Sequence, residues 1–305
     1  MIGFDMKRGT QLEYRSRPSA VAYMIGAVRP SPGFRKAGGV PPITARWLQH
    51  RPDKRELGSF RQLSGLPESE YLPMLYPHTI SFPLQMAILT HSTFPVPIWR
   101  VLQVRNQLLQ LAPVPIGQPL ELSVSVAGHR ILEKGAEIDL HAVASADGMP
   151  AWEAINTFYV RGRFGESERA SPMTAAPAPA PGEQLIAQWR MPAGGGWRFG
   201  GLSGDYNGIH LSGWYARRFG FPRAFLHPQR VLGQCLARLP ALDPATPQRL
   251  DTWLKGPVYY GAPVSLRGTG NGGDTLFALN IDGDARPAII GHLRAVAPQT
   301  RLNSG

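Results

Sequence analysis

An internal repeat is the feature that most constrains how this chain can fold. The segment FRQLSG at residues 60–65 returns as FGGLSG at residues 199–204, an offset of 139 positions. Each copy precedes an amphipathic stretch that opens near a His/Pro pair and is long enough for about three helical turns. These stretches are YPHTISFPLQMAILTH from Tyr76 and LHPQRVLGQCLARL from Leu226. Because self-similarity at a fixed offset is the signature of a repeated structural unit, the chain is predicted to contain one unit twice.

Short strands are expected after each helix. LELSVSVAG at 120–128 corresponds to PVSLRGTG at 263–270, and the AspGly pairs Asp147–Gly148 and Asp282–Gly283 predict hairpin turns. Each unit is therefore a long central helix followed by several antiparallel strands. A helix wrapped by a curved antiparallel sheet is a hotdog, so we predict an α+β double hotdog whose two copies pair as an internal pseudo-dimer. Because the repeated segment is short, two unrelated α+β domains are the alternative.

A change of composition marks the boundary between the two units. The segment ESERASPMTAAPAPAPGE at 166–183 is rich in Pro, Ala and Ser and has almost nothing to bury, which predicts a linker. The expected division is an N-terminal extension at 1–44, a first hotdog at 45–165 and a second hotdog at 184–300.

Composition excludes several classes of protein. The net charge of +11 favours anionic partners, but the basic residues are spread along the chain without the aromatic-interleaved runs of nucleic-acid binders. We therefore expect no nucleic-acid partner. No apolar run of about 18 to 20 residues predicts a membrane span, and the first residues do not read as a secretion signal. The single cysteine, Cys235, forms no internal disulfide, and a cytoplasmic location is predicted.

One segment carries residues suited to acid/base chemistry. LSGDYNGIH at 202–210 places Asp205, Asn207 and His210 within six positions on a turn leading into a helix. Asp205 and His210 could hold one water between them, and Asn207 could orient either partner by hydrogen bonding. In the alternative interpretation, Asp205 and Asn207 cap the helix and His210 is a surface or satisfied core residue. Spacing alone favours this alternative.

The segment resembles the S-G-D-x-N-P-x-H signature of MaoC-like dehydratases and (R)-specific enoyl-CoA hydratases, of the type with two hotdog repeats. Four other segments are similar to that family: FPLQMAILTHSTFP and VLQVRNQ in the first half, and RRFGFPRAFLHPQRVLGQCLARL at 217–239 and LKGPV at 254–258 in the second. The resemblance covers most of residues 45–298. It implies a hydro-lyase, without a cofactor, that acts on 2-enoyl or (R)-3-hydroxyacyl thioesters of coenzyme A or acyl carrier protein. Asp205 and His210 match its catalytic residues.

Two positions depart from the family signature. Gly208 stands where the signature has Pro, which loosens the start of the helix that carries His210. Pro228 stands where the family has a Gly whose backbone N–H is expected to hold the thioester oxygen, and proline has no N–H. The N–H of Gln229 is expected to replace it at the helix start.

The two repeats differ in their candidate chemistry. The offset places Leu66, Glu68 and Tyr71 of the first repeat opposite the three residues of the second-repeat signature, so the first repeat is expected to be degenerate and the chain to have one active site. Arg217 and Arg218 are predicted to bind the phosphates of coenzyme A or an acidic carrier protein.

Other functions remain open. A non-catalytic acyl-thioester-binding hotdog protein or partner subunit is the alternative that Pro228 favours, and a hotdog thioesterase is a third hypothesis. The histidines show no H-x-x-x-H or cysteine-paired spacing, so we predict no metal. A homodimer is a possible assembly.

Overall fold

The computed structural model describes residues 9–34, 38–167, 170, 175–177, 183–271 and 273–302. Most of the Pro/Ala-rich segment at 166–183 therefore lies outside the described residues, as do the first eight residues of the N-terminal extension. None of the helices in the described part of the chain is long and apolar enough to cross a membrane.

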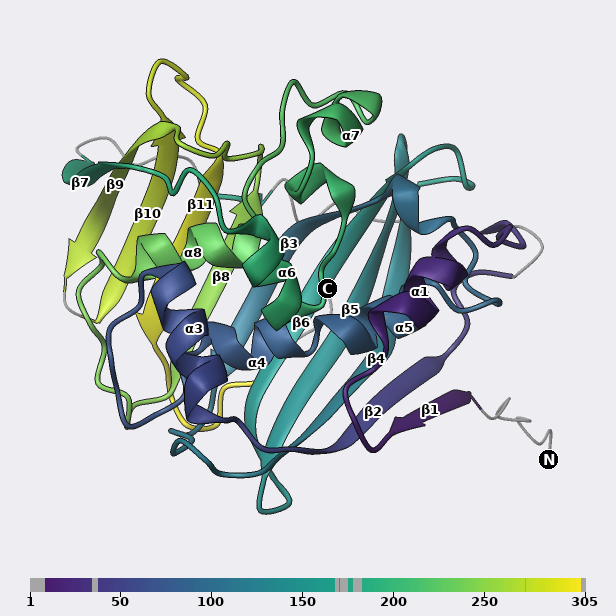
Figure 1. The fold of residues 1–305 in the computed structure, drawn as a ribbon, viewed down its shortest axis with the longest axis horizontal. Helices are drawn as coiled ribbons and strands as arrows, with labels where there is room; N and C mark the ends of the chain where they lie inside the picture. The colour runs from purple at the N-terminus through teal and green to yellow at the C-terminus, as the bar shows by residue number, and fades with distance from the viewer. Residues whose placement is uncertain are drawn as a thin grey trace.

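One continuous sheet of eleven strands forms the body of the molecule, in the order β1-β2-β4-β5-β6-β3-β8-β11-β10-β9-β7 (Figure 1). The first-half strands are β1 (Thr10–Tyr14), β2 (Ile43–His50), β3 (Val101–Gln110), β4 (Leu120–Leu132), β5 (Gly135–Ala146) and β6 (Met149–Arg161). The second-half strands are β7 (Gln184–Arg190), β8 (Gln248–Leu254), β9 (Pro263–Asn271), β10 (Asp274–Ile281) and β11 (Ile289–Ala295).

The strand order shows the repeat directly. The first half runs β2-β4-β5-β6-β3 and the second runs β7-β9-β10-β11-β8, so each half uses its five strands in the same order. The two copies join where the equivalent strands β3 and β8 pair antiparallel, with Asn106 opposite Thr252. Such pairing of equivalent elements is what a pseudo-two-fold axis requires. The predicted double hotdog is confirmed, and β1 adds a further strand parallel to β2.

The helices lie on one face of the sheet (Figure 1). The α-helices are α1 (Ala20–Ala27), α3 (Lys54–Ser64), α4 (Leu75–Ile80), α5 (Phe82–Leu89), α6 (Gly196–Ser203), α7 (Gly213–Arg218) and α8 (Pro228–Leu236), and the short 3-10 helices are η1 (Ile98–Arg100) and η3 (Gly208–His210). Their apolar faces and the facing side of the sheet form one hydrophobic core that spans both repeats.

The repeated sequence segments occupy equivalent places. They form the ends of α3 and α6, each of which stops at a left-handed glycine, Gly65 at φ 73° and Gly204 at φ 79°. Glycine adopts this conformation without the steric cost that a Cβ imposes, which explains why both copies end in SerGly. The rings of Phe60 and Phe199 pack with their centroids 6.4 Å apart, so this pair of equivalent residues meets between the repeats.

The central helix of the first repeat differs from the expectation. Instead of one helix from Tyr76, the chain forms α4 and α5, which meet at Ser81. Pro83 causes the break, because it has no N–H to donate to the carbonyl four residues before it. In the second repeat Pro228 is the first residue of α8, where a missing N–H costs little, and α8 is continuous.

The two predicted turns have different geometries. Asp147 and Gly148 both have positive φ, 50° and 76°, and join β5 to β6 as a tight hairpin, as predicted. Asp282 and Gly283 begin a longer connection between β10 and β11.

His78 of α4 makes the fold sensitive to acid. Its side chain is completely buried, and neither ring nitrogen has a hydrogen-bond partner among the described residues. Burial lowers the pKa of His78 to about 4. In the unfolded chain a histidine binds its proton below about pH 6.5, so the unfolded state takes up more protons between that pH and about pH 4. The stability due to neutral His78 is complete above this window and is lost as the pH falls through it.

We expect His78→Leu to flatten the acid side of the stability profile. The variant should lose a slope of about 1.4 kcal/mol per pH unit in the free energy of unfolding, because one coupled proton is removed. Urea unfolding at about pH 7.5 and about pH 5 measures this slope. His129→Gln, at an exposed histidine, is the control. An unchanged slope in His78→Leu would show that His78 is not protonated on unfolding.

Candidate active site

The loop after α6 fixes the position of Asp205. Gly204 turns the chain out of the helix, and the Ser203 hydroxyl donates to the Phe199 carbonyl at 2.9 Å and accepts from the Asp205 N–H at 3.0 Å. Asp205 Oδ1 then accepts from the Asn207 N–H at 3.0 Å. The carboxyl group is held by its own loop, and it is 90% buried. The capping role that the sequence allowed for Asp205 is therefore not what its carboxyl group does: Oδ1 closes a turn within the loop, the following helix is capped by Asn207, and Oδ2 is left available.

Asn207 acts on the backbone. Its Oδ1 accepts from the Ile209 N–H at 3.2 Å and caps the short helix η3, while the residue itself is exposed. The end of η3 is His210. Asn207 is therefore placed to orient His210 through the helix and makes no side-chain contact with it among the described hydrogen bonds.

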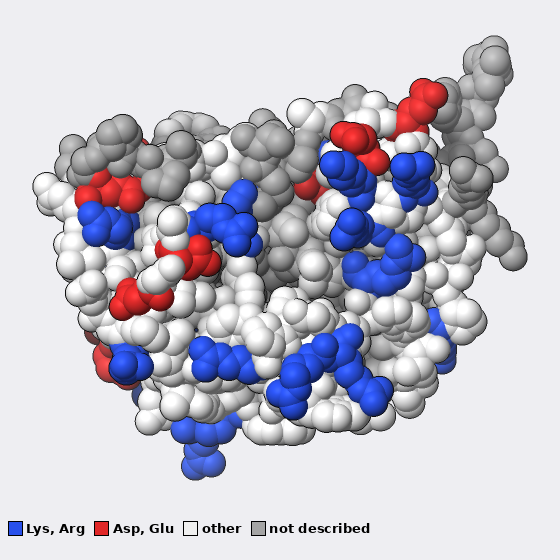
Figure 2. Space-filling model, turned by 90° about the horizontal axis from the view of Figure 1, so that it is seen from above, with Lys and Arg blue, Asp and Glu red and all other residues white. Residues whose placement is uncertain are grey.

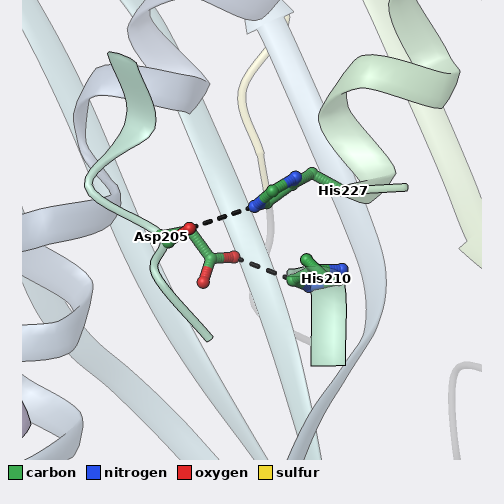
Figure 3. A group of neighbouring side chains, drawn as sticks. All are labelled: Asp205, His210 and His227. Atoms are coloured by element: carbon green, nitrogen blue, oxygen red, sulfur yellow. Dashed lines mark hydrogen bonds and ion pairs between the residues drawn. The ribbon is translucent and has the colours of Figure 1, made fainter. Parts of the chain in front are cut away.

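His210 faces Asp205 with a defined tautomer. Its Nδ1 lies 3.0 Å from the carbonyl oxygen of Phe225, and because a carbonyl only accepts, Nδ1 carries the proton and donates it. Nε2 then has a free lone pair, and it lies 3.8 Å from Asp205 Oδ2 (Figure 3). Burial lowers the pKa of His210, against the opposing effects of Asp205 and the Phe225 carbonyl, so the ring is neutral at pH 7.

His227 is a third member of the cluster that the sequence did not assign. It is the residue before α8, and its ring stacks on His210 at a centroid distance of 4.2 Å. Its Nε2–H donates to the Asp205 carbonyl at 3.0 Å (Figure 3). Burial and the neighbouring His210 lower the pKa of His227 to about 3. The only sequence signal was its place before Pro228, in the segment that resembles the family's His-Gly-Met.

The three side chains are also of the types that bind metal ions. One potential ligand atom from each of Asp205, His210 and His227 lies within 4.8 Å of the others. Each histidine, however, uses one ring nitrogen as a donor to a backbone carbonyl, so only the other nitrogen of each ring has a lone pair. The hydrogen bonds therefore fit two neutral imidazoles beside one carboxylate.

The neutral state of His210 gives a testable pH dependence. If Nε2 must be unprotonated in catalysis, kcat/KM should be constant around pH 7 and fall as the pH drops through the pKa of His210. Because burial lowers that pKa, the fall should lie below about pH 6.5, the usual value for histidine. A pH profile of kcat/KM measures it. An acid limb above pH 6.5 would contradict this assignment of His210.

The start of α8 supplies a free backbone donor next to the cluster. The N–H groups of Arg230 and Val231 both donate to the His227 carbonyl, at 3.0 and 3.2 Å. Pro228 has no N–H, and in the described chain the N–H of Gln229 has no hydrogen-bond acceptor. An N–H at a helix N-terminus stabilises an anion both as a donor and through the helix dipole.

Known proteins resemble this chain in sequence and in fold, although no protein-family model matches it. The 3-hydroxyacyl-thioester dehydratase X of Mycobacterium tuberculosis is 24% identical over 192 residues, which cover 63% of this chain and 68% of that protein. The crystal structure of HtdX from the same organism superposes with a TM-score of 0.70 at 21% identity and covers 83% of this chain and 100% of that one. A MaoC-like dehydratase from Phytophthora capsici gives a TM-score of 0.67 at 18% identity, covering 87% and 98% of the two chains.

The chain has the fold of the MaoC-like dehydratases. The resemblance that the sequence predicted is therefore confirmed. Within this MaoC-like fold the two departures from the signature have different local contexts. A Cβ built on Gly208 would lie 2.6 Å from the ring of Tyr215, so Tyr215 occupies the space that a proline ring would need. At Pro228 the departure removes a donor, and the next N–H along α8 is that of Gln229.

The first repeat has a different loop at the equivalent position. Arg61 donates to Glu68 at 2.7 Å and to the carbonyls of Ser69 and Tyr71 at 2.8 and 2.9 Å, which fixes the loop around a buried guanidinium. The repeat-equivalent residue is Gly200, where even a Cβ would lie 2.9 Å from the Asp205 carbonyl oxygen. An arginine at position 200 would therefore not fit the second-repeat loop as it stands.

The first-repeat positions equivalent to Asp205, Asn207 and His210 do not form an acid/base cluster. Leu66 is partly buried, the Glu68 side chain is 85% exposed in its ion pair with Arg61, and Tyr71 lies in a bridge with Pro115. Neither a buried carboxylate nor an imidazole is found at these three positions.

Arg217 and Arg218 lie in the last turn of α7 and are both exposed. The Arg218 guanidinium lies 4.2 Å from the ring centroid of Trp214, itself 60% exposed. More widely, the face drawn in Figure 2 carries several separate groups of Lys and Arg with fewer Asp and Glu. The two arginines are thus accessible to an anionic ligand, although no contact joins them to Asp205 or His210 among the described residues.

Proposed function

We propose that the protein is a hydro-lyase that adds water to 2-enoyl thioesters or removes it from (R)-3-hydroxyacyl thioesters. The observation that carries the proposal is the pair of acceptors, Asp205 Oδ2 and His210 Nε2, 3.8 Å apart and both buried. One water oxygen can lie at about 2.7 to 3.2 Å from both atoms and donate a hydrogen to each. The similarity to 3-hydroxyacyl-thioester dehydratase X supports the same reaction class.

In the hydration direction, the oxygen of this water attacks the β-carbon of the enoyl group while the lone pair on His210 Nε2 takes one proton from the water. The electron pair of the carbon–carbon double bond moves toward the thioester oxygen and gives an enolate-like intermediate. The imidazolium of His210 then returns the proton to the α-carbon, so one water is added in total. Asp205 orients the water and stabilises the transient positive charge on His210.

The enolate-like oxygen needs a donor, and the N–H of Gln229 at the start of α8 is the candidate. The donor is preorganised because the helix fixes it before the charge develops. His227 supports this arrangement, since its ring contacts His210 and its Nε2–H fixes the Asp205 carbonyl on the other side of the cluster.

The carrier portion of the substrate is assigned by charge. We propose that Arg217 and Arg218, both cationic and exposed beside Trp214, bind the phosphates of coenzyme A or the acidic surface of an acyl carrier protein. No cofactor is needed for this chemistry. A cytoplasmic location and a homodimer remain predictions from the sequence.

Loss of the conjugated enoyl absorbance tests the proposal. The purified protein, mixed with crotonyl-CoA or with a longer 2-enoyl-CoA, should consume this absorbance without releasing free thiol. Release of free thiol would indicate the hotdog thioesterase.

Pro228 favours one second candidate, a non-catalytic acyl-thioester-binding protein, because it removes the donor that the family uses. For this candidate, calorimetry should detect acyl-CoA binding while neither the enoyl absorbance nor the thiol changes. Binding without turnover would therefore replace the proposed activity.

A further inference from the structure

The N-terminal segment reaches the catalytic loop of the second repeat. Arg17 donates from its guanidinium to the carbonyl of Gly201 at 2.9 Å and to the carbonyl of Leu202, both near the end of α6. The helix that follows Arg17 is α1, which packs beside α5 of the first repeat (Figure 1). The segment predicted as an extension thus contacts the second repeat one turn before Asp205.

Tyr23 of α1 places a hydroxyl close to this loop. Its side chain is 9% exposed, and a Cβ built on Gly204 would lie 3.6 Å from the hydroxyl oxygen. Burial raises the pKa of Tyr23 above its ordinary range, and the neighbouring charge of Asp205 raises it further. The phenol therefore keeps its proton at neutral pH and can act as a hydrogen-bond donor.

The Tyr23 hydroxyl differs from the other buried tyrosine. Tyr76 donates to Glu56 at 2.7 Å and contacts His50 at 2.9 Å. The hydroxyl of Tyr23, by contrast, is buried and has no partner within the described part of the chain. Because a buried hydroxyl normally has a partner, an unpartnered donor next to Gly204, the residue before Asp205, points to a ligand atom as its acceptor.

We propose that Tyr23 is a further residue of the active site, whose hydroxyl donates a hydrogen bond to the oxygen bound between Asp205 and His210. This oxygen belongs to the water in hydration and to the 3-hydroxyl group in dehydration, so the proposal rests on the proposed function. In dehydration His210 Nε2 first takes the proton from the α-carbon. The bond between the β-carbon and this oxygen then breaks as the carbon–carbon double bond forms, and the oxygen keeps the electron pair of the broken bond and takes that proton from His210. A donor from Tyr23 stabilises the negative charge that develops on the oxygen before that proton arrives.

The proposal assigns a role to the N-terminal segment. Arg17 fixes the segment to the end of α6, and this contact sets the position of α1 and its tyrosine. The active site is then formed by both halves of the chain: the acid/base pair comes from the second repeat and one donor comes from the segment before the first repeat.

Tyr23→Phe in the full chain tests the assignment, because it removes the hydroxyl and keeps the ring. We expect kcat to fall by about tenfold to 100-fold with little change in KM, less than the 100-fold to 1,000-fold loss typical of a donor to a full oxyanion. Incorporation of 3-fluorotyrosine at position 23, which retains the donor, should restore most of the rate. Tyr14→Phe, at a half-buried tyrosine of β1 in the same segment, is the matched control and should keep the wild-type rate.

The outcomes separate this proposal from the proposed function. A Tyr23→Phe variant with wild-type kcat, or a 3-fluorotyrosine protein as slow as the Phe variant, would overturn the assignment of Tyr23 and leave the hydro-lyase in place. Equal losses in Tyr23→Phe and Tyr14→Phe would also overturn it, since they would indicate a structural effect of the segment. A wild-type protein without turnover of any 2-enoyl-CoA would overturn both.

Discussion

Asp205→Asn and His210→Ala should each lower kcat/KM for a 2-enoyl-CoA by about 100-fold to 10,000-fold, the range for a general acid/base group. Asn keeps the shape of Asp205, and its amide oxygen keeps the contact with the Asn207 N–H. The amide NH2 group then replaces Oδ2, and it cannot accept a hydrogen bond from the water. His210→Ala removes the lone pair that receives the proton. Initial rates from the enoyl absorbance, with circular dichroism to confirm folding, measure both effects.

The first repeat provides the matched controls for these two variants. Glu68→Gln makes the same change of carboxylate to amide in the first-repeat loop, where the position equivalent to Asp205 is Leu66, and Tyr71→Ala changes the position equivalent to His210. Both should retain near-wild-type rates, because no cluster exists there. Loss of activity in these controls would contradict a single active site in the second repeat. Wild-type turnover in Asp205→Asn or His210→Ala would remove that residue from the mechanism.

The second large effect concerns the donor for the thioester oxygen. Gln229→Pro should nearly abolish turnover, because it removes the N–H at the start of α8, and one such donor contributes about 100-fold to 1,000-fold in kcat. Proline is tolerated in the first turn of a helix, so α8 should still form. Gln229→Ala, which keeps the N–H and removes the buried side chain, is the matched control and should lose much less activity.

Pro228→Gly gives the complementary result. If the N–H of Gln229 already holds the oxygen, restoring a donor at position 228 should leave kcat unchanged or lower it, since glycine also loosens the start of the helix. A rise of tenfold or more would instead show that the wild-type site lacks its donor. Full activity in both Gln229→Pro and Pro228→Gly would show that the thioester oxygen is not bound at the start of α8.

The repeat made much of the fold predictable from the sequence. Two SerGly segments at a constant offset required two equivalent units, and the AspGly pair at Asp147 required a tight hairpin, because these depend on local backbone conformation. The helix from Tyr76 was predicted as continuous because its apolar pattern extends through Ser81. Pro83 interrupts it there, which shows that a missing backbone donor outweighs side-chain periodicity.

The candidate site was only partly predictable. Asp205, Asn207 and His210 lie in one loop, so local spacing was enough to identify them together. His227 and Tyr23 reach the same loop from separate elements, 22 and 182 positions from Asp205 along the chain, and only the packing of α8 and α1 brings them there. Local spacing contains no information on such contacts, and the resemblance to the family's His-Gly-Met was the only signal for His227. The role expected for Arg217 and Arg218 depends on a ligand and stays a prediction.

Mass spectrometry of the product formed in ¹⁸O-labelled water tests the central claim most directly. After incubation with a 2-enoyl-CoA, the account predicts an intact 3-hydroxyacyl thioester that carries one ¹⁸O at the β-carbon, and His210→Ala should form it far more slowly. A free carboxylic acid carrying ¹⁸O, together with free coenzyme A, would show attack at the thioester carbonyl and would contradict a hydro-lyase. Recovery of the unlabelled enoyl thioester alone would contradict it equally.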